Sequence, residues 1–198
     1  MDRCAGGDEM KLLILGFGYC ASHFAARHGA SFAAIAATCR SPESEARIGA
    51  AGIAPVRIDH PDGRLHAALA ASDAVLLSAA PDGAGDPFLP LVSGMPVAGK
   101  RFVYLSTVGV YGDHAGAWVD EDTPPKPVSR RSEWRLKAEQ AWLAHGATQG
   151  GTIDILRLSG IYGPGQSALE TVRAGTARRL IKPEQVFNRI HVSDIADA

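Results

Sequence analysis

The sequence has few cysteines, no excess of charge of either sign and no long hydrophobic run. Its three cysteines, Cys4, Cys20 and Cys39, are odd in number and match no zinc or redox spacing. We therefore expect a reducing compartment and interpret Cys20 and Cys39 as small packing residues. A net charge of −1 in 198 residues gives no reason to expect nucleic acid or an anionic membrane as a partner.

Other absences narrow the function further. No apolar segment is long enough to span a membrane, and residues 1–10 lack the apolar core of a secretory signal. His, Asp and Glu do not cluster at metal-ligand spacing, and no serine lies in a nucleophile-elbow motif. Hydrophobic residues make up 46% and charged residues 21%, which is a normal balance for a globular protein. We therefore expect a cytoplasmic protein that acts on a small molecule.

Short apolar runs alternate with helix-forming stretches along the chain. Strands are predicted at Lys11–Leu15, Phe32–Thr38, Ala54–Ile58, Ala74–Ser78, Phe102–Ser106 and Thr152–Leu158. Helices are predicted at Tyr19–His28, from Pro42 behind an N-cap at Ser41, at Arg64–Ala71 and at Ser132–His145. This alternation is typical of an α/β fold with a doubly wound parallel sheet and helices on both faces.

The second half of the chain holds three further features. The helix Ser132–His145 has an apolar stripe made of Trp134, Ala138, Ala141 and Trp142. The proline-rich stretch Asp113–Ser129 is predicted to be a surface loop. Phe187–Ala198 is predicted to form a strand and then the first turn of a helix capped by Ser193.

A glycine motif follows the first predicted strand and opens the first helix. It comprises Gly16, Phe17, Gly18, Tyr19, Cys20 and Ala21, which is the form G-x-G-x-x-A. Gly16 allows the tight turn, Gly18 lets a diphosphate approach the backbone, and Ala21 lets the helix pack closely on the strand. Free N–H groups and the positive end of the helix dipole would then face the phosphates. The motif predicts a Rossmann-type site for a nicotinamide dinucleotide.

The end of the second strand bears on which dinucleotide binds. An NAD site usually has Asp or Glu there for the ribose 2′-hydroxyl, whereas this chain has Arg40 and Ser41. Arg40 can pair with a 2′-phosphate, and Ser41 can add a hydroxyl or simply cap the helix. We therefore expect NADP(H) rather than NAD(H). Asp59, after the third strand, could reach the adenine, and Ser78, after the fourth, would line the crevice at the carboxyl ends of the strands.

Four later segments resemble the extended short-chain dehydrogenase/reductase superfamily, specifically its NAD-dependent epimerase/dehydratase group. They are Tyr104–Asp113, Trp118–Pro125, Leu156–Gly165 and Arg189–Ala196. The G-x-G-x-x-A form, in place of that group's G-x-x-G-x-x-G, points to an atypical subgroup. The resemblance implies a Rossmann fold and a sugar-nucleotide or another carbonyl or hydroxyl substrate. Because a further substrate-binding portion follows in that family, we expect the chain to be C-terminally truncated.

The resemblance also implies a catalytic set, which this chain matches only in part. Members use a Ser or Thr to polarise a carbonyl, and Thr107 matches that position. The Tyr and Lys positions of their Tyr-x-x-x-Lys pair fall on Arg131 and Arg135. Arginine keeps its proton, so Arg131 cannot act as acid and base, although Arg135 could hold ribose or pyrophosphate oxygens. Tyr111 and Tyr162 are candidates to replace the missing phenol, with loop packing as the alternative role of both.

These observations leave two functions open. One is an NAD(P)-dependent oxidoreductase or epimerase/dehydratase with Thr107, Tyr111 and Arg135 as catalytic candidates; the other is a non-catalytic NADP(H)-binding sensor. The expected organisation is a flexible tail over 1–9, an NAD(P)-binding domain over 10–165 and the beginning of a small C-terminal substrate lobe over 166–198. The long helix is a candidate homodimer surface. His114 is a candidate to enter the cleft, and His191 is expected to pack or to cap a helix.

Overall fold

The computed structural model describes residues 10–59, 63–179, 181 and 186–198. The expected tail over 1–9 lies outside these residues. Six parallel strands form the main sheet in the order β3-β2-β1-β4-β5-β6. They are β1 (Lys11–Leu15), β2 (Ala34–Cys39), β3 (Ala54–Arg57), β4 (Ala74–Leu77), β5 (Arg101–Thr107) and β6 (Thr152–Leu158). The strand order reverses between β1 and β4, which is where ligands bind in such sheets.

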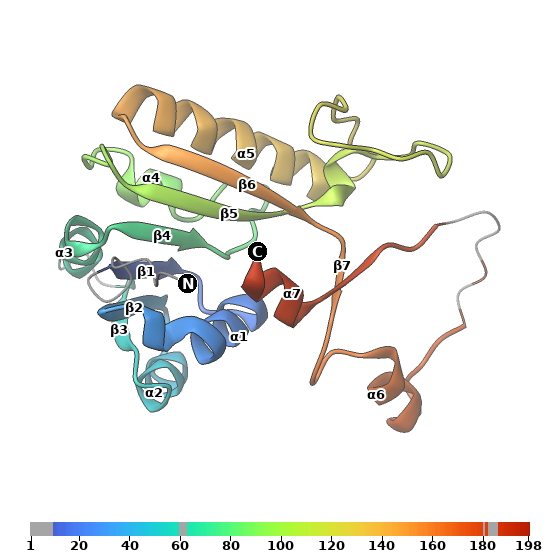
Figure 1. Ribbon diagram of the computed structural model, residues 1–198, viewed down its shortest axis with the longest axis horizontal. Helices are drawn as coiled ribbons and strands as arrows, with labels where there is room; N and C mark the ends of the chain where they lie inside the picture. Colours follow the sequence, from blue (N-terminus) through green and yellow to red (C-terminus); the bar gives the residue numbers. More distant parts are fainter. Residues whose placement is uncertain (1–9, 60–62, 180, 182–185) are drawn as a thin grey trace, which may run out of the picture.

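Helices cover both faces of this sheet, as Figure 1 shows. The face with α1 (Tyr19–His28) and α2 (Pro42–Ala50) lies opposite the face with α3 (Arg64–Ala71), α4 (Leu89–Val92) and α5 (Arg130–Gln149). Two single-turn 3₁₀ helices, η2 (Gly29–Ser31) and η3 (Val108–Val110), follow α1 and β5. The doubly wound parallel sheet expected from the sequence is therefore confirmed.

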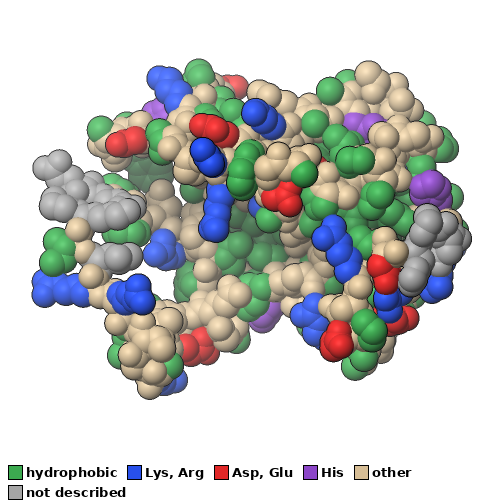
Figure 2. All heavy atoms as spheres, turned by 180° about the vertical axis from the view of Figure 1, so that it is seen from behind, with side chains coloured by type: hydrophobic (Ala, Val, Ile, Leu, Met, Phe, Trp, Pro, Cys, Tyr) green, Lys and Arg blue, Asp and Glu red, His purple; other side chains and the backbone are tan. Residues whose placement is uncertain are grey.

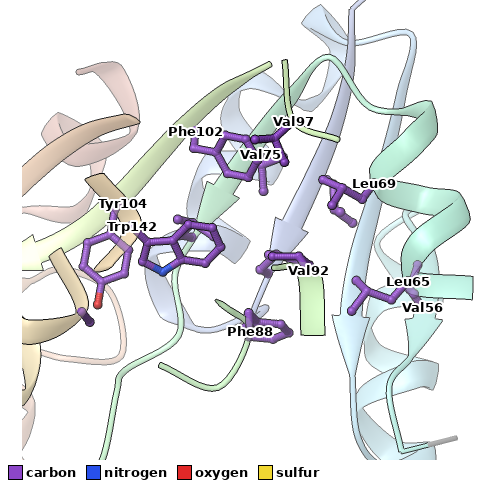
Figure 3. Close-up of a cluster of buried hydrophobic side chains, with 14 residues drawn as sticks. Val56, Leu65, Leu69, Val75, Phe88, Val92, Val97, Phe102, Tyr104 and Trp142 are labelled. Atoms are coloured by element: carbon purple, nitrogen blue, oxygen red, sulfur yellow. The ribbon is translucent and has the colours of Figure 1, made fainter. Parts of the chain in front are cut away.

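The larger hydrophobic cluster fills the space between the sheet and α3, α4 and α5 (Figure 3). Trp142 of α5 packs against Phe102 of β5 with ring centroids 5.7 Å apart, and both side chains are fully buried. A smaller cluster under α1 and α2 contains Ile14, Ala21 and Ile48, each with no exposed surface. Burying these side chains supplies the main driving force for closing helices onto both faces.

The last part of the described chain leaves the sheet and returns to it. After β6 the chain forms β7 (Gly160–Tyr162) and α6 (Ala168–Arg173), and β8 (Arg189–His191) then pairs with β7 in parallel. The chain ends in α7 (Val192–Asp197), which packs against α1 (Figure 1). Seen from behind in Figure 2, hydrophobic side chains gather in the recessed centre of the molecule. Neither the boundary at 165/166 nor a separate substrate lobe is tested by this arrangement, and both stay predictions.

Element boundaries agree closely with the sequence predictions, and one cap was assigned wrongly. The ranges Lys11–Leu15, Tyr19–His28, Arg64–Ala71 and Thr152–Leu158 are confirmed, as are Ser41 as N-cap and Pro42 in the first turn of α2. The other strands shift by one or two residues. α5 is longer at both ends because Ser129 caps its start and Gly150, with φ +75°, ends it. Ser193 is not the N-cap of the last helix. His191 takes that role, since its Nδ1 accepts the N–H of Ser193 at 3.2 Å.

Candidate functional site

The turn between β1 and α1 has the geometry that its glycines predict. Gly16 has φ +92°, and a Cβ there would lie 3.0 Å from the backbone nitrogen of Ala79, so both conformation and space require glycine. The Gly16 N–H donates to the Thr38 hydroxyl at 2.8 Å, which ties the turn to the end of β2. A Cβ added to Gly18 would meet nothing within 4 Å. The backbone at Gly18 is therefore open to an approaching group.

The N-terminus of α1 suits an anion. Gly18 is the N-cap and supplies no side-chain cap, and the first turn contains no acidic residue. Within the described residues, no side chain is recorded as accepting from the first N–H groups of this helix. Ala21 is fully buried, which brings the helix close to β1. Unpaired N–H groups, the helix dipole and the open face of Gly18 together fit a diphosphate.

Two other residues of the motif contribute through packing. The Phe17 side chain is buried in the cluster under α1 and α2, and its carbonyl accepts from Arg47 Nη2 at 2.9 Å. The Arg47 guanidinium also lies 5.8 Å from the centre of the Phe17 ring. Cys20 is half-buried, and burial raises the pKa of its thiol, which disfavours the reactive thiolate. The contact of Arg47 with the Phe17 carbonyl and that of Thr38 with the Gly16 N–H were not identified from the sequence. For Thr38, a hydroxyl at the end of β2 was an available signal.

The end of β2 presents a cation to solvent. The Arg40 side chain is exposed, and the described part of the protein records no hydrogen bond or ion pair for it. Ser41 caps α2 by accepting the Ser44 N–H at 3.2 Å, so its hydroxyl is already engaged. Arg40 is therefore placed, without an internal partner, where the sequence predicts the ribose 2′-position.

Asp59 and Ser78 lie at the carboxyl ends of their strands, as predicted. Asp59 is exposed and accepts from Arg57 Nε at 2.8 Å, so its carboxylate is already paired. An open hollow of about 350 Å³ beside it is lined in part by Arg57, Ile58, Leu65 and His66. The Ser78 N–H donates to the Leu15 carbonyl oxygen at 3.0 Å, and its side chain is half-buried. That this side chain lines the crevice stays a prediction.

Thr107 ends β5, and Arg135 of α5 is bonded to the same strand. Thr107 Oγ1 accepts the Gly109 N–H at 3.1 Å, which leaves its own hydroxyl hydrogen free to donate. Arg135 Nη1 donates to the carbonyl oxygens of Leu105 at 2.9 Å and Ala79 at 3.3 Å, and to the Tyr104 hydroxyl at 3.2 Å. Burial raises the pKa of Tyr104 to about 12 against the opposing effect of Arg135, so Tyr104 is a neutral partner. The Nε and Nη2 of Arg135 have no recorded bond within the described residues.

Tyr111 follows η3 and packs against a different arginine. It is 7% exposed, and the Arg157 guanidinium lies 4.8 Å from its ring centre. Arg157 Nη2 in turn donates to Glu139 at 2.9 Å, and the Ser106 hydroxyl donates to the same carboxylate. Glu139 is 1% exposed in the middle of α5, and sequence reasoning missed its burial. An open hollow of about 440 Å³, lined by Tyr111 and Arg157 among others, lies here and contains no residue of the glycine motif.

The remaining candidates have structural partners. Tyr162 stacks edge-on with His191, with ring centroids 5.0 Å apart. His191 caps α7, which confirms one of the two roles expected for it. His114 Nε2 lies 3.1 Å from the Tyr111 carbonyl oxygen. Arg131, which the sequence analysis expects at the Tyr position, is exposed. Among the described residues no group of three His, Cys, Asp or Glu could hold a metal ion, and no helix is long and apolar enough to cross a membrane.

The strand order and the glycine turn define the class: this is a Rossmann-type α/β protein. Within that class, the chain belongs to the NAD dependent epimerase/dehydratase family, whose model matches residues 88–198. The matched range contains all four segments that carry the resemblance in the sequence. The family assignment is therefore confirmed by residues outside the glycine turn, which lies before the matched range.

The chain is also similar to an Escherichia coli protein and to a protein of known structure. Protein YeeZ of Escherichia coli K12 is 34% identical over 98 residues, which are 50% of this chain and 33% of YeeZ. A solved structure of a functionally unknown conserved protein from Silicibacter pomeroyi DSS is 40% identical and superimposes with a TM-score of 0.79. That alignment covers 95% of this chain and 66% of the other, so the chain spans about two thirds of that protein's length and its match spans a third of YeeZ.

A more distant structure shares the fold alone. The dTDP-glucose 4,6-dehydratase of Bacillus anthracis, solved in complex with NAD, is 22% identical with a TM-score of 0.74. The alignment covers 95% of this chain and 69% of the dehydratase. At this identity the agreement supports the sheet order and the position of the crevice, and it carries no residue roles.

Proposed function

We propose that this protein is an NAD(P)-dependent oxidoreductase or epimerase/dehydratase that binds its cofactor across β1, β2 and α1. The observation that carries the proposal is the open backbone at Gly18, at the uncapped N-terminus of α1 and beside the strand-order reversal. When bound, the nicotinamide would accept or donate a hydride. The protein's own residues would supply binding, orientation and exclusion of water around the reacting carbon.

The cofactor we expect is NADP(H). Arg40 is exposed at the end of β2 and has no hydrogen bond or ion pair to the residues that the structure describes, so it can pair with a 2′-phosphate there. Arg47 fixes the carbonyl of Phe17 and so holds the loop on which the diphosphate would rest. NAD is the cofactor in the dehydratase complex named above, so the preference for the phosphorylated form is a property we assign to this chain's own residues.

Nicotinamide fluorescence tests the cofactor site directly. Titrating NADPH and NADH against the wild type should show the tighter dissociation constant for NADPH. Arg40→Ala should weaken NADPH about 10- to 100-fold, the value of one charge-assisted hydrogen bond, and leave NADH nearly unchanged. Lys137→Ala, which removes an exposed cation from α5, is the control and should leave both constants unchanged. A wild type that prefers NADH, or equal losses for both cofactors in Arg40→Ala, contradicts the preference.

The substrate class we propose is a sugar-nucleotide or another carbonyl or hydroxyl compound. Solved neighbours include a UDP-N-acetylglucosamine 4-epimerase from Methanobrevibacter ruminantium and a UDP-glucuronic acid 4-epimerase from Bacillus cereus, which name that class for themselves. Thr107 is the residue we expect to polarise the substrate oxygen, because its hydroxyl hydrogen is free. Arg135 would hold cofactor or substrate oxygens through its remaining N–H groups.

The surroundings of Arg131 and Tyr111 also support a second function, a non-catalytic sensor. The family's Tyr position is occupied by exposed Arg131, and Tyr111 is buried under Arg157. With arginine at the position expected for Tyr and with Tyr111 buried, a non-catalytic NADP(H)-binding sensor fits the same cofactor site. Mixing the protein and NADPH with a panel of carbonyl compounds separates the two functions. Loss of NADPH absorbance that Thr107→Ala abolishes supports the enzyme, whereas saturable binding without turnover supports the sensor.

A further inference from the structure

The first turn of α5 places a hydroxyl beside Thr107 that no sequence motif marks. Ser132 follows the Tyr position directly, and its half-buried side chain points toward η3, unlike the exposed Arg131. A Cβ built on Gly109 would lie 3.0 Å from Ser132 Oγ and 3.4 Å from Thr107 Oγ1. The two hydroxyl oxygens therefore flank the bare face of Gly109.

The hydrogen-bond pattern leaves both hydroxyls able to donate. Thr107 Oγ1 accepts from the Gly109 N–H, and Ser132 Oγ accepts from the Ser129 hydroxyl at 2.9 Å. Ser129 is fixed in turn, because its Oγ accepts the Ser132 N–H at 3.2 Å as the N-cap of α5. Among the described residues, neither Thr107 nor Ser132 has a recorded acceptor for its hydroxyl hydrogen. Each hydroxyl oxygen thus accepts one hydrogen bond, and its own hydrogen remains available to a group beside Gly109.

We propose that Thr107 and Ser132 form a hydroxyl pair that holds the reacting oxygen of the substrate over Gly109. This inference rests on the proposed function and deepens it by naming a second substrate-orienting residue. Each hydroxyl donates one hydrogen bond to a carbonyl or alcohol oxygen, and neither has to give up its proton to do so. Gly109 is required because any side chain there would fill the space between the two donors.

The surroundings of the pair agree with this role. Arg135 lies one turn further along α5, on the same side as Ser132, and bonds the Leu105 carbonyl two residues before Thr107. A guanidinium near a carbonyl or alcohol oxygen stabilises negative charge that develops there. The end of β5 and the start of α5 thus place two hydroxyls beside Gly109, and the Arg135 cation is bonded to the same strand at Leu105.

Four variants test the pair in the full chain. Ser132→Ala removes one donor, and Gly109→Ala keeps both hydroxyls but places a methyl between them. Ser132→Thr retains the hydroxyl and is the conservative rescue. Thr148→Ala is the matched control, because that hydroxyl lies on the same helix and only bonds the helix's own carbonyls of Ala144 and His145, each at 3.0 Å.

Three measurements are made on each variant: NADPH affinity by nicotinamide fluorescence, the affinity of UDP-glucuronic acid and dTDP-glucose for the protein–NADPH complex, and turnover with those sugars and a carbonyl panel. We expect Ser132→Ala and Gly109→Ala to keep NADPH affinity within about twofold. Both should lose about tenfold in substrate affinity or kcat/KM, the value of one hydrogen bond to a neutral group. Ser132→Thr should recover most of the loss, and Thr148→Ala should match the wild type.

The outcomes separate this inference from the proposed function. A Ser132→Ala variant with wild-type kcat/KM and substrate affinity overturns the hydroxyl pair and leaves the proposed function standing. A wild type that binds NADPH but neither binds nor converts any compound of the panel overturns the pair as well, and it supports the sensor. A wild type that binds no nicotinamide dinucleotide overturns the proposed function and the pair together.

Discussion

Glu139 is a carboxylate almost without exposed surface in the middle of an otherwise amphipathic helix. It holds three elements together, since it belongs to α5 and accepts hydrogen bonds from Ser106 of β5 and Arg157 of β6. The hydrogen bond to Glu139 raises the pKa of Arg157. A buried ion pair adds little stability over an apolar replacement, but breaking one partner is costly because the other charge is left behind.

Glu139→Gln should therefore destabilise the protein strongly. We expect a loss of about 3 kcal/mol in the free energy of unfolding, at the low end for a broken buried pair because Arg157 keeps 21% of its side chain exposed. Urea denaturation followed by circular dichroism measures it. Glu121→Gln, the same change at an exposed loop residue, should stay within about 0.5 kcal/mol of the wild type. Equal stability of the two variants would show that the network carries no net stabilisation.

Single residues also show where sequence reasoning stops. The stripe predicted for α5 placed Trp142 and Ala138 correctly in the core, but Glu139 is buried beside them while Ala141 is only half-buried. The reason is a charged partner, Arg157, that lies 18 residues away on β6 and has no local signature. The prediction of Ser193 as the N-cap of α7 was wrong for a related reason. Serine is the commoner cap, but the imidazole of His191 already accepts the Ser193 N–H.

Two glycines within helices, Gly146 and Gly49, differ in the space that surrounds them. Gly146 of α5 faces β6, and an added Cβ would lie 2.5 Å from Ile153 Cγ1 and 2.9 Å from the Gly151 oxygen. Gly49 of α2 has nothing within 4 Å of the same position. We expect Gly146→Ala to cost about 1–3 kcal/mol through overpacking, and Gly49→Ala to add about 0.5 kcal/mol by reducing the freedom of the unfolded chain.

Thermal unfolding of both glycine variants beside the wild type measures this contrast. The midpoints should move in opposite directions although the substitution is the same. A fall in both would mean that Gly49 is required for a reason other than packing. Stabilisation by Gly146→Ala would mean that α5 can shift away from β6 without loss.

Elements delimited by local chemistry were predicted to the residue, whereas of the two short strands that pair over a long range only β8 was predicted, within Phe187–Ala198. β1, α1, α3 and β6 match to the residue because glycine, serine or aspartate bounds each of them. β7 and β8 were harder to predict, since each is three residues long and exists through pairing with the other across 26 or more intervening residues. The candidate site divides similarly: the sequence marks Gly16, Gly18 and Thr107, but Ser132 is identified only by its place beside Gly109.

The docking of α7 on α1 should depend on pH. Asp197 receives hydrogen bonds from Arg27 Nη2 at 2.7 Å and pairs with His28 Nε2 at 2.8 Å, and these contacts lower its pKa. Because the folded-state pKa lies below the unfolded value, the contacts stabilise the docked helix above about pH 4, where an unperturbed aspartate is ionised. That contribution is lost as the pH falls through the lowered value.

Amide hydrogen exchange of α7, corrected for intrinsic rates between about pH 6 and about pH 3, follows this loss of docking. Protection in the wild type should fall over the acid range. Asp197→Asn should show weaker protection at neutral pH and little further change on acidification. Asp122→Asn, an exposed loop aspartate outside this contact, should behave as the wild type. An Asp197→Asn profile that parallels the wild type would remove the carboxylate as the cause.

At the scale of the whole molecule, the cofactor site draws on parts of the chain that are far apart. The glycine turn that we propose as this site is tied to Thr38 of β2 and packed against Ala79 after β4. Tyr19, which follows the turn, links it to the segment before α6, because its hydroxyl donates to the Pro164 carbonyl at 2.8 Å. A ligand bound at Gly18 therefore requires these segments to be in place. Binding and folding of the Rossmann body should be linked, whereas a dimer through α5 is an independent prediction that sedimentation equilibrium tests.

This linkage gives a prediction that needs no substrate. At a free NADPH concentration of 100 times its dissociation constant, binding should stabilise the folded chain by about 2.7 kcal/mol and raise the melting midpoint by roughly 5–10 °C. Gly18→Val should abolish the shift with little change in intrinsic stability, because the added side chain enters open space that only a ligand would use. Gly16→Val is expected instead to lower stability even without cofactor, since φ +92° and the contact with Ala79 both exclude a side chain. An NADPH shift that survives Gly18→Val would place the diphosphate elsewhere and remove the basis for assigning this turn as the cofactor site.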